Sequence, residues 1–113
     1  MIIYHNPRCR KSREGLAYLE EKGQQVDVRE YLKDAFTKKE LNELIEKLGI
    51  EPSALIRKNE KIYKEQYKGR EIDERQWVEI MIEHPKLIER PIVVNGDRAV
   101  VARPKEEIDK LMA

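Results

Sequence analysis

The order of the secondary structure predicted from the sequence indicates an α/β fold with a mixed four-stranded sheet. Three observations lead to this. A strand–helix–strand unit opens the chain, and such a unit forms a parallel crossover. An Asn-Gly turn between two apolar runs, at residues 95–96, forms an antiparallel hairpin near the end. Several short helical segments lie between these two parts of the chain.

The opening unit covers residues 1–31. Residues 1–5 form a short apolar run that Asn6-Pro7 stops, which predicts a buried strand. A helix is predicted from residue 10 to 22, with apolar residues at a spacing of three. Residues 26–31 alternate well enough to predict a second strand.

Two capping boxes predict the helices in the middle of the chain. Residues 37–40 read Thr-Lys-Lys-Glu and open a helix that ends at Gly49, and residues 73–76 read Asp-Glu-Arg-Gln and open a helix that Pro85 ends. Two shorter helices are predicted between them, at 52–58 and 60–68.

The last part of the chain predicts a hairpin and a final helix. Residues 91–94 form one strand, Asn95-Gly96 the turn and 99–102 the partner strand. Pro104 opens the last helix, whose buried stripe is expected to be Ile108, Leu111 and Met112. Taken together, we predict a single thioredoxin-like domain over residues 1–113: a mixed four-stranded sheet flanked by helices, with an inserted helical subdomain at about 37–84.

Composition excludes several classes of protein. Charged residues make up 40% of the 113 residues, yet the formal net charge is only +1, which argues against a nucleic-acid-binding arm. No apolar run approaches the roughly 20 residues that span a bilayer, and no signal peptide is visible. Neither a metal site nor a bound cofactor is expected. A lone cysteine favours a reducing compartment, so we expect the protein in the cytoplasm. We also expect it to be a monomer.

That cysteine, Cys9, lies in the stretch HNPRCRKSR, among the cations Arg8, Arg10, Lys11 and Arg13. If the helix begins near Arg10, its unpaired N–H groups and positive dipole end stabilise the Cys9 thiolate. Such surroundings can lower a cysteine pKa from about 8.5 to roughly 3.5–7.5. His5 could add to this if it is protonated.

Motif tests narrow the chemistry of this thiol. A two-cysteine redox motif needs a cysteine at position 12, where Ser12 stands, and a tyrosine-phosphatase loop needs an arginine where Gly15 stands. Neither His5 nor His84 suits a cysteine protease. What remains is a single-thiolate site that also favours anions. Three arginines beside apolar runs support an oxyanion site: Arg57, Arg90 and Arg103.

At these residues the sequence resembles the arsenate reductase family of the glutaredoxin-linked, thioredoxin-fold type. The resemblance rests on four ordered blocks, YHNPRCRKSR, ALIRKNE, HPKLIERPIVV and ARPKE, and covers roughly residues 2–111. It implies that Cys9 attacks arsenate or a similar oxyanion, that His5 helps to lower the Cys9 pKa and that Ser12 hydrogen-bonds the thiolate. It also implies that the three arginines hold the oxyanion and that the bond before Pro91 is cis.

The same resemblance implies glutathione as co-substrate and glutaredoxin as the partner that regenerates the enzyme. One departure concerns Arg8, Arg10 and Lys11, because typical members carry small or uncharged residues there. Two alternatives stay open: a glutathione-dependent thiol reductase of the same fold without arsenate activity, and an Spx-like regulator that binds RNA polymerase. Ser12 and the arginine set disfavour the regulator.

Overall fold

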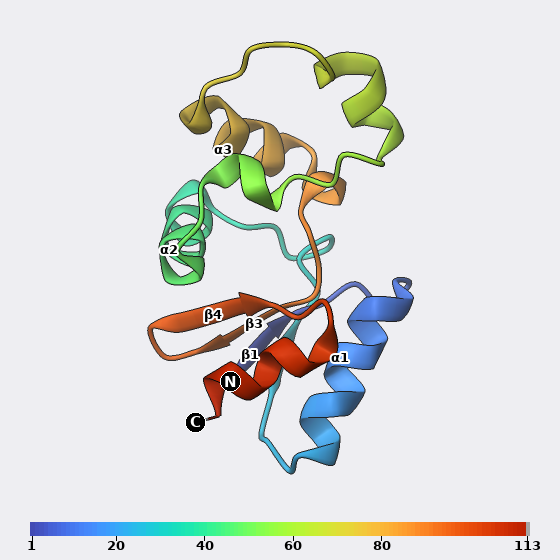
Figure 1. The fold of residues 1–113 in the computed structure, drawn as a ribbon, viewed down its shortest axis with the longest axis vertical. Helices are drawn as coiled ribbons and strands as arrows, with labels where there is room; N and C mark the ends of the chain where they lie inside the picture. Colours follow the sequence, from blue (N-terminus) through green and yellow to red (C-terminus); the bar gives the residue numbers. More distant parts are fainter. Residues whose placement is uncertain (113) are drawn as a thin grey trace. The chain divides into compact units, whose positions relative to one another are not determined.

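The computed structural model describes residues 1–112 and divides the chain into two compact units (Figure 1). The first unit comprises Met1–Asp34 together with the chain from Arg90 onward, and the second is Ala35–Glu89. The predicted insertion at about 37–84 falls inside the second unit. That the two units form a single domain stays a prediction. No helix within residues 1–112 is long and apolar enough to cross a membrane.

The first unit contains the predicted mixed sheet. Its strands are β1 (Ile2–Tyr4), β2 (Asp27–Arg29), β3 (Ile92–Asn95) and β4 (Arg98–Val101), in the spatial order β2-β1-β3-β4. Strands β1 and β2 are parallel, whereas β3 pairs antiparallel with both β1 and β4. The predicted crossover and hairpin are therefore both confirmed.

Strand β2 is shorter than the predicted 26–31. It lies at an edge of the sheet, and Val28 is 47% exposed. Val26 and Tyr31, which the alternation placed in this strand, lie just outside it. An edge strand forms backbone hydrogen bonds with one neighbouring strand only. The apolar alternation of residues 26–31 therefore extends further along the chain than the residues that pair with β1.

Two helices pack together on one face of the sheet. They are α1 (Arg10–Glu21) and η4 (Lys105–Leu111), and η4, the predicted final helix, is a 3₁₀ helix. A 3₁₀ helix has three residues per turn, so Ile108 and Leu111 share its buried face. The core that they complete consists of Ile3, Leu19, Val93, Ala102, Ile108 and Leu111.

The hairpin turn lies one residue later than predicted. Asn95 pairs with Arg98, so Gly96 and Asp97 form the turn, and Gly96 takes a positive φ of 64°. The reason is tertiary: the Asn95 amide donates to the Leu111 carbonyl at 2.7 Å, which holds Asn95 in the strand and joins the hairpin to η4.

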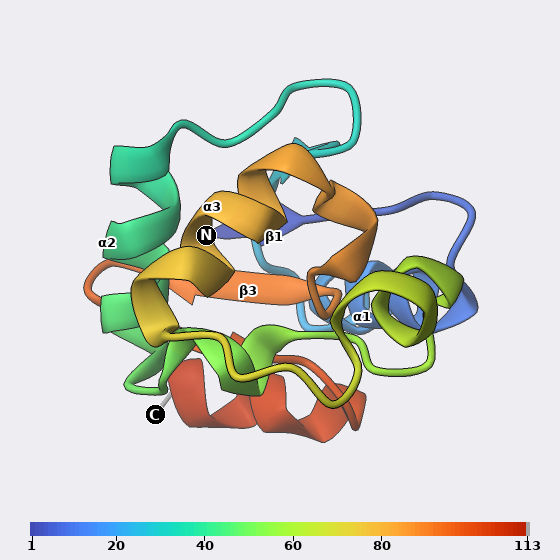
Figure 2. The ribbon, with the colours of Figure 1, turned by 90° about the horizontal axis from the view of Figure 1, so that it is seen from above.

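The second unit is helical. It contains α2 (Lys38–Leu48), η1 (Pro52–Leu55), the π-helical turn η2 (Tyr63–Tyr67), α3 (Glu74–Glu83) and η3 (Pro85–Leu87). Helices α2 and α3 contact each other (Figure 2). Both predicted capping boxes form: Thr37 accepts from the Glu40 N–H at 3.1 Å and Asp73 from the Gln76 N–H at 2.9 Å.

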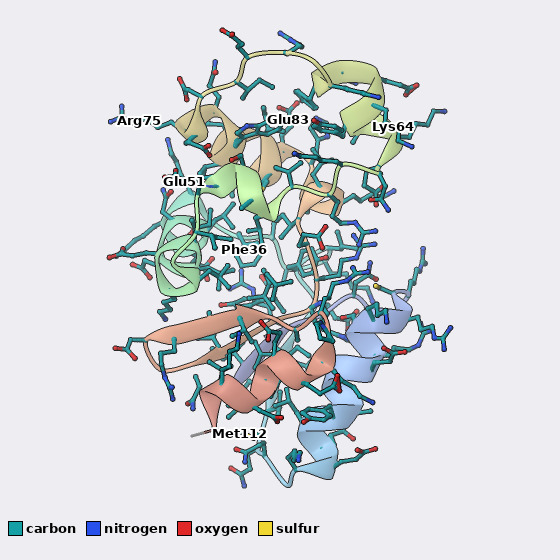
Figure 3. The ribbon with its side chains drawn as sticks, in the orientation of Figure 1. Phe36, Glu51, Lys64, Arg75, Glu83 and Met112 are labelled. Atoms are coloured by element: carbon teal, nitrogen blue, oxygen red, sulfur yellow. The ribbon has the colours of Figure 1, made fainter. Side chains whose placement is uncertain are left out.

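The two short helices of this unit are smaller than predicted. The one opened by Pro52 ends at Leu55 rather than near residue 58, and the segment at 60–68 includes a single π-helical turn. Tyr63 and Tyr67 of that turn contact the Trp77 ring, at centroid distances of 6.2 and 5.8 Å. Lys64, from the same turn, extends outward (Figure 3).

Candidate active site

The candidate site lies in the first unit, in the loop between β1 and α1. Cys9 is the N-cap residue of α1, with an extended backbone (φ −95°, ψ 123°), as the sequence predicts. Its N–H donates to the Asn6 carbonyl at 3.0 Å, and its carbonyl accepts from the Arg13 N–H at 3.0 Å. Cys9 as a residue is partly exposed. The cysteine is therefore held at the start of the helix, in a position that is not fully buried.

Ser12 organises this loop from inside the helix. Its hydroxyl is fully buried, lies 2.6 Å from His5 Nδ1 and accepts a hydrogen bond from the Asn6 N–H at 3.0 Å. Within residues 1–112 the Ser12 hydroxyl makes no hydrogen bond to Cys9. The structure thus places Ser12 beside the catalytic candidate, but its hydroxyl is engaged with His5 and Asn6.

The pKa of the Cys9 thiol is lowered. Partial burial is the largest single cause and raises it, but the lowering causes together outweigh burial, and the Arg90 guanidinium contributes to them through a hydrogen bond and its charge. The backbone N–H groups of Ser12 and Lys11 lower the pKa further. These are the N–H groups that a helix N-terminus leaves unpaired, so the helix-start argument and Arg90 together favour a thiolate.

His5 does not supply a positive charge at neutral pH. Burial lowers its pKa, Glu30 partly offsets this and Arg13 lowers it again. An imidazole whose pKa lies below 6.5 is mainly neutral at pH 7. That His5 helps to lower the Cys9 pKa stays a prediction, and its contact with Ser12 ties it to the site.

Arg90 reaches Cys9 because of a close packing contact. The Arg90–Pro91 peptide bond is cis, as the family resemblance implies, and Pro91 is buried. A Cβ on Gly15 would lie only 2.8 Å from Pro91 Cγ, so the α1 backbone approaches this proline closely. Gly15 therefore lets the Arg90–Pro91 segment lie against the helix that begins at Cys9.

Arg103 contacts Arg90 within the first unit. Its Nη1 donates to the Arg90 carbonyl at 3.3 Å, and its side chain is exposed. The Arg103–Pro104 bond is cis as well, which the sequence analysis did not predict. Of the three predicted oxyanion-binding arginines, Arg90 and Arg103 thus belong to the unit that holds Cys9.

Arg57 belongs to the second unit, two residues after η1 ends at Leu55. Its N–H donates to the Leu87 carbonyl at 2.7 Å, and its side chain is 12% exposed. Nε lies 3.5 Å from Glu60 Oε1, too far for a good hydrogen bond, and Nε and Nη1 are buried with no hydrogen-bond partner among residues 1–112. Its part in the site stays a prediction.

Comparison with known proteins identifies the family. The ArsC family model matches residues 4–111, almost the whole chain. The chain belongs to the ArsC family. Among its relatives, it is 40% identical to an arsenate reductase of Haemophilus influenzae, over 99% of this chain and 98% of that protein. It is 37% identical to an arsenate reductase of Neisseria meningitidis serogroup A, over 97% and 96% of the two chains.

Solved structures of the ArsC family agree with this. The arsenate reductase from Vibrio cholerae superposes with a TM-score of 0.92 at 43% identity, covering 97% of this chain and 95% of that one. The mixed four-stranded, thioredoxin-like α/β fold predicted from the sequence is therefore confirmed.

Two residues of this ArsC-family site were missed by the sequence analysis. Asn6 is buried, its side-chain oxygen accepts from the Arg8 N–H at 3.0 Å and its carbonyl accepts from Cys9, so it shapes the loop. Gly15 permits the approach of Pro91. A glycine inside a predicted helix is a signal for such a close contact. In the sequence, Asn6 was interpreted only as part of the turn that ends the first strand.

Proposed function

We propose that this protein is an arsenate reductase that uses Cys9 as its nucleophile and external thiols as reductants. The observation that carries the proposal is the lowered pKa of the Cys9 thiol, at the start of α1 and beside the Arg90 guanidinium, in a chain of the ArsC family. The same positive groups that stabilise a thiolate also attract a tetrahedral oxyanion. The relatives named arsenate reductases support arsenate as that anion.

In this reaction the arginines bind and orient the arsenate. Arg90 is positioned to neutralise its charge near Cys9, and Arg103 contributes a second guanidinium from the adjoining segment. Arg57 is the proposed third ligand. Its buried Nε and Nη1 form no hydrogen bond among residues 1–112, although the Glu60 carboxylate lies 3.5 Å from Nε, and a closer anionic ligand would satisfy these donors.

The chemical steps then follow from the single cysteine. The Cys9 thiolate attacks arsenic and expels a hydroxyl group, which leaves as water after taking up a proton. A glutathione thiolate attacks the Cys9 sulfur, the S–As bond breaks and its electron pair stays on arsenic, which becomes arsenite. The product is a Cys9–glutathione mixed disulfide, which a second thiol, such as that of glutaredoxin, reduces.

This scheme needs external thiols because the chain has no second cysteine. Ser12 occupies the position of a resolving cysteine, and a hydroxyl cannot form a disulfide. No bound cofactor takes part. The cytoplasm, where glutathione and glutaredoxin are kept reduced, is the proposed compartment, and a monomer is the proposed active form.

Arsenite formation by purified protein with arsenate, glutathione and glutaredoxin tests the proposal. Arg90→Ala and Arg103→Ala should each lower kcat/KM for arsenate by roughly 10- to 150-fold, the effect of losing one charge-assisted hydrogen bond. Arg90→Lys and Arg103→Lys should retain more activity than the Ala variants but less than wild type, because lysine lacks the bidentate geometry. Arg75→Ala is the matched control, because Arg75 is exposed at the start of α3 (Figure 3). Absence of arsenite with intact thiol exchange would instead favour a thiol reductase.

A further inference from the structure

Four cationic side chains lie within four residues of Cys9 in the sequence. We call Arg8, Arg10, Lys11 and Arg13 the cationic loop. All four side chains are exposed, and the principal causes of the lowered Cys9 pKa include none of them. The positive surroundings of the Cys9 thiol thus come mainly from Arg90 and from backbone N–H groups, whereas these four side chains face solvent.

The members of the cationic loop differ in what they bind. Arg13 Nη1 donates to the Pro7 carbonyl at 2.9 Å. Arg10 and Lys11 share one carboxylate, that of Glu14, at 3.4 and 3.6 Å. The Arg8 side chain makes no hydrogen bond or ion pair within the part of the chain that the structure describes. Arg8 is thus the member most available to an external anion.

The backbone fixes Arg8 next to the sulfur-bearing residue. Its N–H donates to Asn6 Oδ1 at 3.0 Å, and the next N–H, of Cys9, donates to the Asn6 carbonyl at 3.0 Å. Consecutive Cα atoms are about 3.8 Å apart. The Arg8 Cα is therefore adjacent to that of Cys9, and at low ionic strength, where the Debye length is about 30 Å at ~0.01 M, the Arg8 charge acts on an anion that approaches Cys9.

We propose that the cationic loop selects a small anionic thiol as the reductant that attacks Cys9, with Arg8 as the main specificity-determining residue. The proposal rests on the proposed function, in which an external thiol must reach Cys9. Glutathione fits, since its two carboxylates outnumber its one ammonium group. In the step concerned, the incoming thiolate forms a bond to the Cys9 sulfur, the bond from that sulfur to its leaving group breaks and the leaving group takes the electron pair.

Thiol exchange without arsenate tests this selection. Cys9 is first converted to a mixed disulfide with thiopyridine, which is an uncharged leaving group. The probe thiol then attacks the Cys9 sulfur, and the rate at which thiopyridine is released is measured. Three two-carbon thiols serve as probes: 2-mercaptoethanesulfonate, 2-mercaptoethanol and 2-mercaptoethylammonium. The measured quantity is the ratio of the rate for the anionic thiol to that for the cationic thiol. Comparing this ratio between variants cancels the intrinsic reactivity of each thiol.

Arg8→Ala should lower the ratio by roughly three- to tenfold, the size expected for removing one exposed charge at short range. Glu14→Gln should raise it, because Arg10 and Lys11 lose their shared carboxylate. Lys22→Ala is the control of equal charge. Lys22 lies beyond the far end of α1, some 19 Å from Cys9 at about 1.5 Å per residue, and should leave the ratio unchanged.

Salt provides a second measurement. Raising KCl from ~0.01 M to ~0.5 M should bring the wild-type ratio close to that of Arg8→Ala, since the Debye length shrinks well below 10 Å. An equal ratio in wild type and Arg8→Ala, an equal fall in Lys22→Ala, or no response to salt would each overturn the proposal. Because arsenate is absent, a failure here is distinguishable from a failure of arsenate reduction itself.

Discussion

His5 Nδ1 and Ser12 Oγ lie 2.6 Å apart, and the same hydroxyl oxygen accepts the Asn6 N–H at 3.0 Å. One buried side chain of α1 therefore joins the end of β1, the loop before Cys9 and the first turn of the helix. Because the pKa of His5 is lowered by burial, this contact links a neutral imidazole to the site. His5 and Ser12 are best understood as residues that hold the loop in position.

Ser12→Ala should destabilise the protein. Removing the hydroxyl leaves the buried Asn6 N–H without its acceptor and His5 Nδ1 without its partner. An unsatisfied buried polar group costs about 1–3 kcal/mol, so the free energy of unfolding in urea should fall by about that amount. An unchanged free energy would show that the loop does not depend on this hydroxyl.

His5 predicts a pH dependence of stability. Since the pKa of His5 is lower in the folded than in the unfolded protein, the unfolded state binds more protons as pH falls. The stability linked to His5 is complete above about pH 6.5 and is lost as pH falls through its folded pKa. In urea titrations at pH values from above about 6.5 downward, His5→Asn should lose less stability than wild type as the pH falls. Parallel curves would contradict this.

Arg90 should set the pKa of Cys9. Arg90→Met removes a charge-assisted hydrogen bond worth about 1.5–3 kcal/mol, which corresponds to a rise of roughly 1–2 pKa units. The rate of alkylation against pH measures this value. Arg103→Met is the matched control, because Arg103 is not among the principal causes of the shift. A rise of the same size in both variants would argue against a specific Arg90 contact.

Gly15→Ala should destabilise the protein although alanine favours helices. The new Cβ would lie 2.8 Å from Pro91 Cγ, and overpacking costs about 1–3 kcal/mol, against a propensity gain of at most about 1 kcal/mol. Any shift of Pro91 also moves Arg90, so the Cys9 pKa should rise.

The exposed Ala17 of the same helix supplies the control. Ala17→Gly should cost about 1 kcal/mol of stability and leave the Cys9 pKa unchanged. A Gly15→Ala variant that is more stable than wild type, with the same Cys9 pKa, would show that the contact with Pro91 yields easily.

Elements with local signals could be predicted from the sequence. The boxes at Thr37 and Asp73 close within four residues, and the Cys9 helix start depends on its own neighbours, so each follows from a short stretch. Tertiary contacts decided what the sequence did not predict. Asn95 stays in its strand because its amide donates to the Leu111 carbonyl, a residue 16 positions later.

For the candidate site, the sequence indicated which residues to consider, but it did not indicate which of them interact with Cys9. The sequence pointed to Cys9 and Arg90, which the structure brings together, but it attributed the lowered Cys9 pKa to charges close to Cys9 in the sequence. Proximity in sequence is a poor guide to side-chain direction, because long exposed side chains such as that of Arg10 extend into solvent. Arg90, 81 positions later, is brought to Cys9 by the sheet and by the packing of Gly15 on Pro91.

Intact mass spectrometry after a single turnover tests the central claim most directly. Protein is mixed with arsenate and glutathione, without glutaredoxin, and arsenite is measured in the same sample. The account predicts one arsenite and one glutathionyl group per chain, with the adduct on Cys9, removed by dithiothreitol and absent in Cys9→Ser. Arsenite formed by Cys9→Ser, or by wild type without any thiol, would contradict it.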